Sequence, residues 1–530
     1  MEELLDKAWY VVALLFWLIP ALIRWAAKRR KNQAQQQIPA QPVQTYEQPP
    51  VPVAAPPPVV APTPVAIEGP RENMLVRARA VREAAGDLER RAMLHGKVSA
   101  RLLPAIRDDC KAPVEALIER LEARDRPLAA GEFRLLERDL GRLEHLVDLF
   151  GFVLEQRTKV TLAPLLHVLD GAAQDCLLPY LVHARRLEIP FQAARAMVVI
   201  EPTDDAAAPP LEADDLVAAV MSESALDRPG GWSEIASQVA LGWVHGIPDL
   251  APTLANGLGL PEARSSSAQF AATGRLTIAA LTSMWLPHLA ADTLATLQLG
   301  PAFAAGLAES LMSTGGPDQA VQSRIERGFR LGPPPLHLRM YVACVTLDRM
   351  GREEDATARW ERWKMAAGEP ESFVLRSDRF PPLNIPLERT YGYVAGVVEG
   401  VTTRPMSVLG GYPLGQISGV LYDPETSRRV EAAAISLAAG EPVVEPPRTI
   451  LAAAAMAAEE AAHSEARIRK AAIDSLSDVG ADGVRVVRRG RAAAAGPIDF
   501  RAMLADAGFF ARAVAVSAAF ARTRGGRVGR

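Results

Sequence analysis

The sequence is poor in cysteine, and the few cysteines it has are far apart. Cys110, Cys176 and Cys344 are the only three in 530 residues, and no two of them form a Cys-x-x-Cys pair. This number and spacing exclude a disulfide framework, a zinc ribbon and a thioredoxin-like redox site. The composition is therefore compatible with a reducing compartment.

The chain also lacks a dominant charge and the short motifs of several large enzyme classes. Its 59 basic and 62 acidic side chains leave a formal net charge of −3, which excludes the overall basic excess typical of many nucleic-acid-binding proteins. No Gly-Lys-Ser/Thr follows the glycines near 410–419, so they do not form a phosphate-binding loop of the P-loop type. A Gly-x-Ser-x-Gly nucleophile elbow is absent as well.

Apolar residues are abundant in this chain. They make up 49% of the sequence, against 23% charged residues, which is enough for packed cores. A length of 530 residues predicts about three domains. Apolar side chains recur mostly at helical spacing, as over 131–150, so we expect a mainly α fold (α with minor β).

An uncharged run of sixteen residues at 8–23 predicts a single transmembrane helix. As a helix it covers about 24 Å, slightly less than the hydrocarbon core of about 30 Å, and a snorkelling Arg24 extends it. Five basic residues lie within 24–31 and only Lys7 precedes the run, so the positive-inside rule places the C-terminal bulk in the cytoplasm. The alternative is a cleaved signal peptide, which the acidic residues before Lys7 and the lack of a small-residue cleavage pattern disfavour. We therefore expect residues 1–31 to anchor the chain in a bacterial inner membrane, with the lipid bilayer as its first partner.

Residues 32–70 form a predicted linker. The segment contains eleven prolines, and its only charged residues are Glu47 and Glu68. Such a composition cannot bury a core and favours extended polyproline II, which at about 3.1 Å per residue spans up to roughly 100 Å. The alternative to a plain spacer is a docking site for an SH3-like partner.

The remaining sequence divides by composition into four predicted parts. Residues 71–201 read as a charged helical domain that ends in a short strand at 196–201, and 211–365 read as an apolar helical domain. Within the second part we expect a buried core helix at 275–289 and a helical hairpin, 336–350 with 353–365, that turns at Gly351. Residues 366–448 mix glycine with aromatic and β-branched residues, which predicts loops and short strands. The last part, 449–530, combines an Ala-rich helix at 449–476 with an arginine-rich segment.

Three short motifs lie in order along the apolar domain. The first is Trp285-Leu286-Pro287-His288 with Asp292, the second is Gly300-Pro301-Ala302-Phe303, and the third is Pro333-Pro334-Pro335-Leu336 with Arg339. This order resembles a zincin-like metallopeptidase domain over residues 190–365. In that pattern an His-Glu-x-x-His helix supplies two metal ligands and the catalytic base, a later Trp-x-Glu-x-x-x-Asp helix supplies an acidic ligand, and a His-Pro-Pro-Leu-x-x-Arg turn follows.

The sequence departs from that pattern at the metal-binding positions. None of the eight histidines lies in His-Glu-x-x-His, and the corresponding helix, 232–247, carries Glu234, Gln238 and His245 instead. Pro287 and His288 occupy the acidic position, and only Asp292 is kept. The resemblance therefore implies a degenerate domain that has lost its metal, with no catalytic or cofactor-binding residue retained.

A surviving metal site is the alternative. His288 and Asp292 are four residues apart, so they share one helix face, and His245 would complete a set of three nitrogen and oxygen ligands. These three residues are the metal-site candidates, and zinc is the cofactor they would hold. The rival interpretation is a core helix in which His288 bonds to a neighbour.

The C-terminal segment is strongly basic. Residues 484–530 contain ten arginines and no lysine against two acidic residues, a local net charge of +8. Arginine binds phosphates in a bidentate manner, so anionic lipid or nucleic acid is a candidate partner, and a solvated terminus is the alternative.

Together these patterns favour a membrane-anchored, non-catalytic interaction or scaffold protein over an enzyme. The alternatives left open are a metal-dependent hydrolase (a peptidase) with an atypical ligand set, and a protein that binds anionic lipid or nucleic acid through its C-terminal arginines. Its protein partners cannot be named from the sequence.

Overall fold

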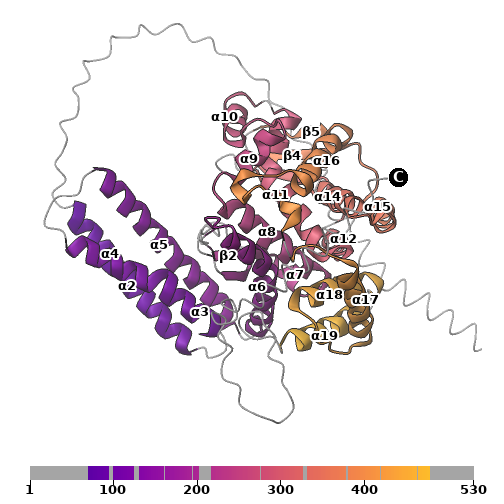
Figure 1. Ribbon diagram of the computed structural model, residues 1–530. Coiled ribbons are helices and arrows are strands. Elements are labelled where there is room, and N and C mark those ends of the chain that lie inside the picture. The colour runs from indigo at the N-terminus through magenta and orange to yellow at the C-terminus, as the bar shows by residue number, and fades with distance from the viewer. Residues whose placement is uncertain are drawn as a thin grey trace, which may run out of the picture. The chain divides into compact units, whose positions relative to one another are not determined.

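The computed structural model describes residues 70–477, except 95–98, 124–129, 160, 192, 194, 202–215, 275, 315, 326–330, 378–379, 418 and 462–463. The described residues belong to one compact unit and are mainly helical with two small sheets, which confirms the mainly α prediction (Figure 1). The predicted anchor, the arginine-rich segment and the predicted linker lie outside these residues, except for the last linker residue, Pro70, which begins a helix. Among the described helices none is both long and apolar enough to cross a bilayer.

The N-terminal helices of the described chain surround a hydrophobic core of their own. Helices α2, α4 and α5 lie side by side as long rods (Figure 1). Apolar residues at three- and four-residue spacing, such as Met74, Ala78 and Val81 on α2, are buried between them. The elements are α2 (Pro70–Leu94), α3 (Ser99–Ala105), a π-helical turn η1 (Ile106–Lys111), α4 (Ala112–Glu122) and α5 (Ala130–Thr158).

A two-stranded parallel sheet lies between this core and a second, larger one. It is formed by β1 (Arg195–Ile200) and β2 (Leu216–Met221), which follow α6 (Ala163–Arg186). Because side chains alternate along a strand, Met197 and Val199 enter the α2–α5 core while the even-numbered residues of β1 enter the larger core. The strand predicted at 196–201 is confirmed. The predicted domain boundary between 201 and 211 instead falls between two paired strands of one sheet.

Side chains take the place of a third strand along the free edge of β1. Gln174 Oε1 accepts from the Ala196 N–H at 3.0 Å, and Gln156 both accepts from the Ile200 N–H and donates to the Ile200 carbonyl, each at 3.0 Å. At Val198 the N–H donates to Asp170 Oδ1 (2.8 Å) and the carbonyl accepts from Arg157 Nη2 (2.9 Å).

Helix α11 (Ile278–Leu299) occupies the middle of the larger core. Thr277 caps its N-terminus by accepting from the Ala280 N–H, and the positive φ of Gly300 (60°) ends it. It packs against α8, α10, α14 and α16. A buried core helix is confirmed here, although it begins three residues later than predicted and extends ten residues further. The neighbouring elements are α7 (Glu223–Leu226), the 3₁₀ turn η2 (Gly230–Ser233), α8 (Glu234–Gly246), α9 (Leu250–Gly257), α10 (Ala263–Thr273) and α12 (Pro301–Thr314).

The predicted helical hairpin is confirmed as α14 (Leu336–Arg349) and α15 (Glu353–Ala367). Gly351 lies between them with a φ of 76°, a conformation that favours glycine. A three-stranded sheet lies nearby, in which β4 pairs in parallel with β3 and antiparallel with β5. Its elements are α13 (Pro317–Ala320), β3 (Gln322–Ile325), β4 (Ser372–Ser377) and β5 (Leu383–Pro386).

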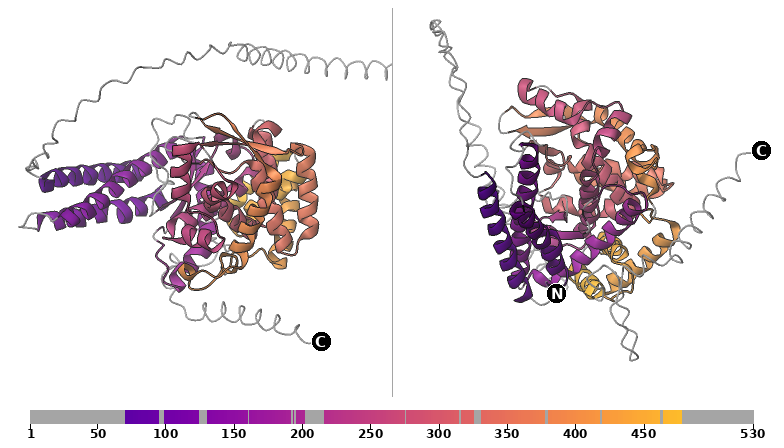
Figure 2. Two further views of the ribbon diagram at one scale, coloured as in Figure 1. Left: turned by 90° about the horizontal axis from the view of Figure 1, so that it is seen from above. Right: turned by 60° about the vertical axis from the view of Figure 1, so that its left-hand side comes forward.

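The prediction of loops and short strands over 366–448 was wrong for most of that region. Apart from β4 and β5 it contains α16 (Leu387–Thr403), the turns η4 (Ser407–Leu409) and η5 (Leu414–Gln416), and α17 (Pro424–Ala439). The Ala-rich helix predicted at 449–476 is two helices, α18 (Pro447–Glu460) and α19 (Glu465–Ser477). Helices α17, α18 and α19 pack together (Figure 2).

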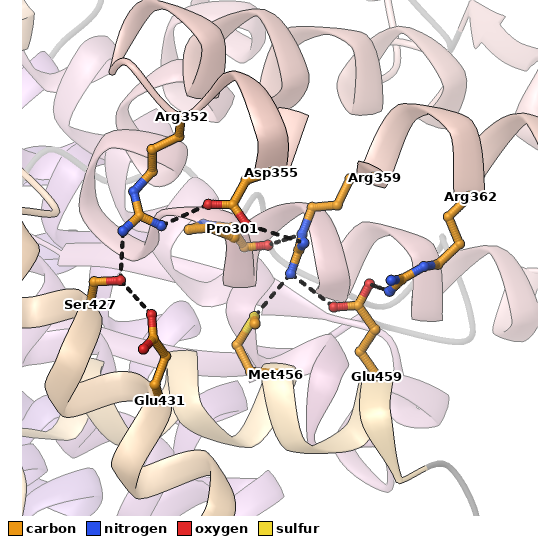
Figure 3. A network of polar contacts seen from close by, with 9 residues as sticks. All are labelled: Pro301, Arg352, Asp355, Arg359, Arg362, Ser427, Glu431, Met456 and Glu459. Carbon is orange, nitrogen blue, oxygen red and sulfur yellow. Dashed lines mark hydrogen bonds and ion pairs between the residues drawn. The ribbon is translucent and has the colours of Figure 1, made fainter. Parts of the chain in front are cut away.

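A network of arginine contacts joins α15 to α17 and α18 (Figure 3). Arg359, 7% exposed, donates to the Pro301 carbonyl and to Glu459 Oε2, each at 2.9 Å, and Glu459 also pairs with Arg362. Arg352 Nη2 donates to Ser427 Oγ at 2.6 Å. One hydrophobic core continues from Leu165 to Leu476, so the boundaries predicted at 365 and 448 do not separate independent cores.

Candidate functional site

The three predicted metal ligands lie on two adjacent helices. His245 is near the C-terminal end of α8 and exposed, whereas His288 and Asp292 lie one turn apart on α11. His288 is half-buried, and Asp292 is 1% exposed. Helices α8 and α11 pack directly against each other.

Asp292 is fully engaged by neighbouring side chains. Arg339 on α14 donates from Nε to Asp292 Oδ2 at 2.9 Å and from Nη2 to Oδ1 at 3.0 Å, a bidentate pair. Ser237 on α8 donates its hydroxyl to Asp292 Oδ1 at 2.6 Å. Both carboxylate oxygens therefore already accept charge-assisted or short hydrogen bonds.

A second carboxylate faces the same guanidinium. Glu234 Oε2 lies 3.6 Å from Arg339 Nη1, and Ser310 on α12 donates its hydroxyl to Glu234 Oε1 at 2.5 Å. We call these five residues, Glu234, Ser237, Asp292, Ser310 and Arg339, the Arg339 cluster. Burial alone lowers the pKa of Arg339, but the two carboxylates outweigh it and hold that pKa above its usual value. The guanidinium is thus a permanent cation at the junction of four helices.

His288 lies in the field of this cation. Burial lowers the pKa of its imidazole, and the positive charges of Arg339 and His245 lower it further, to about 3. His288 is therefore neutral at physiological pH. A neutral imidazole is a competent metal ligand, but here a divalent ion would have to share its surroundings with a guanidinium.

The donors present do not fit a divalent cation. Asp292, the predicted carboxylate ligand, has its oxygens committed to Arg339 and Ser237. Within the part of the chain that the structure describes, which includes all three candidates, no group of three His, Cys, Asp or Glu side chains comes together as a metal site. Metal binding by His245, His288 and Asp292 stays a prediction that this geometry does not support.

The structure brings two of the motif segments into contact. Trp285 on α11 donates its indole N–H to the Gly332 carbonyl, just before the Pro-Pro-Pro turn, at 2.9 Å. About two helical turns further along α11, Asp292 pairs with Arg339 of the same downstream segment. The segments 285–292 and 332–339 are thus joined by an indole hydrogen bond and an ion pair.

Arg339, Glu234 and Ser237 were not singled out as site residues from the sequence. A signal for an ionic partner was present, because Asp292 is the only charged residue in α11 and a lone acid in an apolar helix requires a buried cation or a hydrogen-bond donor. Nothing in the spacing identified Arg339, 47 residues away, as that partner.

No protein-family model matches this chain, and neither the curated proteins nor the solved structures compared with it gave a match. The zincin-like resemblance consequently rests on the motifs alone.

Proposed function

We propose that this chain is a non-catalytic interaction or scaffold protein whose 190–365 region is a degenerate zincin-like domain. In this proposal Arg339 supplies the positive charge that a metal ion would supply in an active relative. Residues 1–31 hold the protein at a bacterial inner membrane, and residues 32–70 space its helical part from the bilayer.

One observation carries the proposal: the acidic residue that the pattern keeps is already neutralised by an internal cation. Asp292 is 1% exposed and receives three hydrogen bonds, two of them from Arg339. A buried carboxylate in a bidentate ion pair gives up its partner only at a cost of several kcal/mol. The cluster is thus suited to holding α8, α11, α12 and α14 together rather than to binding an exchangeable ion.

The proposal is tested by metal analysis of the purified full chain after incubation with zinc, together with a broad peptidase screen. We expect zinc well below one ion per chain and no hydrolysis above that of a buffer control. Stoichiometric zinc with hydrolysis that is abolished by His288→Ala would overturn the proposal and favour the hydrolase alternative.

His145→Ala is the matched control, because His145 lies on α5 among the N-terminal helices. If both histidine variants keep a weak activity at the level of the natural chain, the activity belongs to a contaminant. If only His288→Ala loses it, the activity belongs to this chain.

A further inference from the structure

The arginine network between α15 and α18 includes a methionine sulfur (Figure 3). Arg359 donates from Nη2 to Met456 Sδ at 3.0 Å, and the same nitrogen donates to Glu459 Oε2 at 2.9 Å. Its Nε donates to the Pro301 carbonyl at 2.9 Å. One guanidinium on α15 thus holds the first residue of α12 and two residues of α18, and one of its acceptors is a thioether.

Met456 combines this internal contact with access to solvent. Its side chain is half-buried, whereas its neighbours at 449–455 and 457–458 on α18 are buried. A thioether sulfur has two lone pairs, and the Arg359 contact uses one of them. Five other methionines are at most 3% exposed: Met74, Met197, Met221, Met340 and Met406. Met456 is therefore open to a small reagent in a way that these core methionines are not.

We propose that Met456 is a redox-sensitive modification site, at which a peroxide converts the thioether to methionine sulfoxide. A sulfur lone pair attacks one oxygen of hydrogen peroxide, and an S–O bond forms as the O–O bond breaks. The hydroxide that leaves takes the proton of the transferred oxygen and departs as water. The sulfur loses two electrons and the peroxide gains two. This inference goes beyond the proposed function and does not depend on it.

Oxidation changes what Arg359 holds. The sulfur of a sulfoxide carries a partial positive charge, so it no longer accepts from a guanidinium that lies 3.0 Å away in the reduced chain. The new oxygen is a stronger acceptor than the sulfur was, and it competes with Glu459 and the Pro301 carbonyl for the same donors. Because Arg359 is only 7% exposed, water does not replace the contacts that it gives up. The connection of α15 to α12 and α18 therefore loosens.

The test is treatment of the purified full chain with hydrogen peroxide. Peptide mass spectrometry locates the sulfoxides, and hydrogen–deuterium exchange measures the opening of each helix. We expect a sulfoxide at Met456 and at Met365, which is 81% exposed, while Met340 stays a thioether. In the oxidised chain the amides of α15 and α18 should exchange about tenfold faster or more, because a buried hydrogen bond to a charged group is lost. Amides of α5, which contains no methionine, serve as the reference.

Two variants isolate the sulfur of Met456. Leucine has nearly the volume of methionine but no sulfur, so the exchange of α15 and α18 in Met456→Leu should not respond to peroxide. Met365→Leu is the matched control, because Met365 lies on α15 itself and makes none of the contacts of Arg359 described above. The Met365→Leu chain should keep the full response, and treatment with methionine sulfoxide reductase should reverse it.

Three outcomes overturn the proposal. The first is a Met456 that stays a thioether while Met365 is oxidised, and the second is a sulfoxide at Met456 with unchanged exchange in α15 and α18. The third is a peroxide response that persists in Met456→Leu. If Met456→Leu does not fold, the reductase experiment on the Met365→Leu chain decides instead. Fast exchange that remains after Met456 has been reduced then overturns the proposal, and recovery supports it.

Discussion

Two bidentate arginine–aspartate pairs in this molecule use their remaining hydrogen-bonding groups in different ways. The side chains of Arg157 and Asp170 are 3% and 4% exposed. Besides pairing with each other, they hydrogen-bond to the carbonyl and the N–H of Val198 at the edge of β1. Besides pairing with each other, Arg339 and Asp292 contact two further side chains: Arg339 pairs with Glu234, and Asp292 accepts a hydrogen bond from Ser237. The first pair is required by the fold, because without it a strand edge loses its partners. The hydrogen bonds and ion pairs of the second pair described above reach side chains only, and two carboxylates face its single guanidinium. Under the proposed function, we interpret this surplus of acidic groups as the remnant of a site.

We expect the largest loss of stability when one of the two arginines is replaced and its aspartate stays. Arg157→Met leaves Asp170 buried without a counter-charge and also removes donors from the carbonyls of Val153 and Val198. We expect the free energy of unfolding to fall by about 3–5 kcal/mol, measured by urea unfolding of the full chain. The loss of stability in Arg339→Met should lie at the lower end of that range, because Glu234, one of the two carboxylates that lose their partner, is 20% exposed and can be hydrated. Equal losses of unfolding free energy in Arg157→Met and Arg339→Met would contradict the different roles that we assign to the two pairs.

The second prediction distinguishes the two pairs by whether replacing the aspartate as well restores the stability lost with the arginine. Adding Asp292→Leu to Arg339→Met removes the uncompensated charge and should recover most of the lost stability, since replacing both members of a buried ion pair by apolar residues is often neutral. Adding Asp170→Leu to Arg157→Met should not, because the N–H and carbonyl of Val198 stay orphaned at about 1–3 kcal/mol each. Comparable rescue in both double variants would contradict the assignment of different roles.

A smaller effect is expected at the end of the same strand edge. Gln156→Leu removes two hydrogen bonds to Ile200 without leaving a buried charge. We expect a loss of about 1–3 kcal/mol, with faster amide exchange confined to β1 and its neighbours. The control is Gln322→Leu, whose side chain makes an exposed hydrogen bond to Asp318 and should cost almost nothing.

The smallest predicted effect is electrostatic. The positive charge of Arg339 contributes to the low pKa of His288, so Arg339→Met should move that pKa upward from about 3 towards its usual value. Nuclear magnetic resonance titration of the His288 ring measures this directly, and Arg157→Met should leave it unchanged. A histidine whose pKa is depressed in the folded state costs stability as the pH falls from about 6.5 towards 3, so the part of the acid-induced loss of stability that His288 causes should be smaller in the Arg339→Met chain.

Helices and strands were predicted well where the apolar residues followed a single clear pattern. The apolar spacing over 131–150 became α5, and the short apolar run 196–201 became β1. Helix α16 was missed because its glycines and β-branched residues suggested strands. However, Gly392, Gly396 and Gly400 are four apart, and this helical spacing is the signal that was overlooked. At Gly400 a Cβ would lie 2.7 Å from Leu258 Cδ2, so a larger residue there would have to displace that leucine side chain.

The candidate site was predicted in its location but not in its chemistry. The motifs directed attention to α8 and α11, and they suggested metal ligands where the structure has an ion pair. Which cation neutralises Asp292 depends on how α14 crosses α11, and that crossing is set by long-range packing that a linear pattern does not encode.

The sheet formed by β1 and β2 has a consequence for how the chain can be divided. Met197, Val199 and Leu216 belong to the same core as α2–α5, although they lie beyond α6 in the sequence. A fragment that stops after α5 would leave that apolar surface open to water. The shortest fragment that keeps the α2–α5 core covered therefore extends through Met221 and includes α6. Cutting the chain anywhere between Thr158 and Leu216, by excision, recombination or proteolysis, should give two insoluble fragments rather than two folded domains.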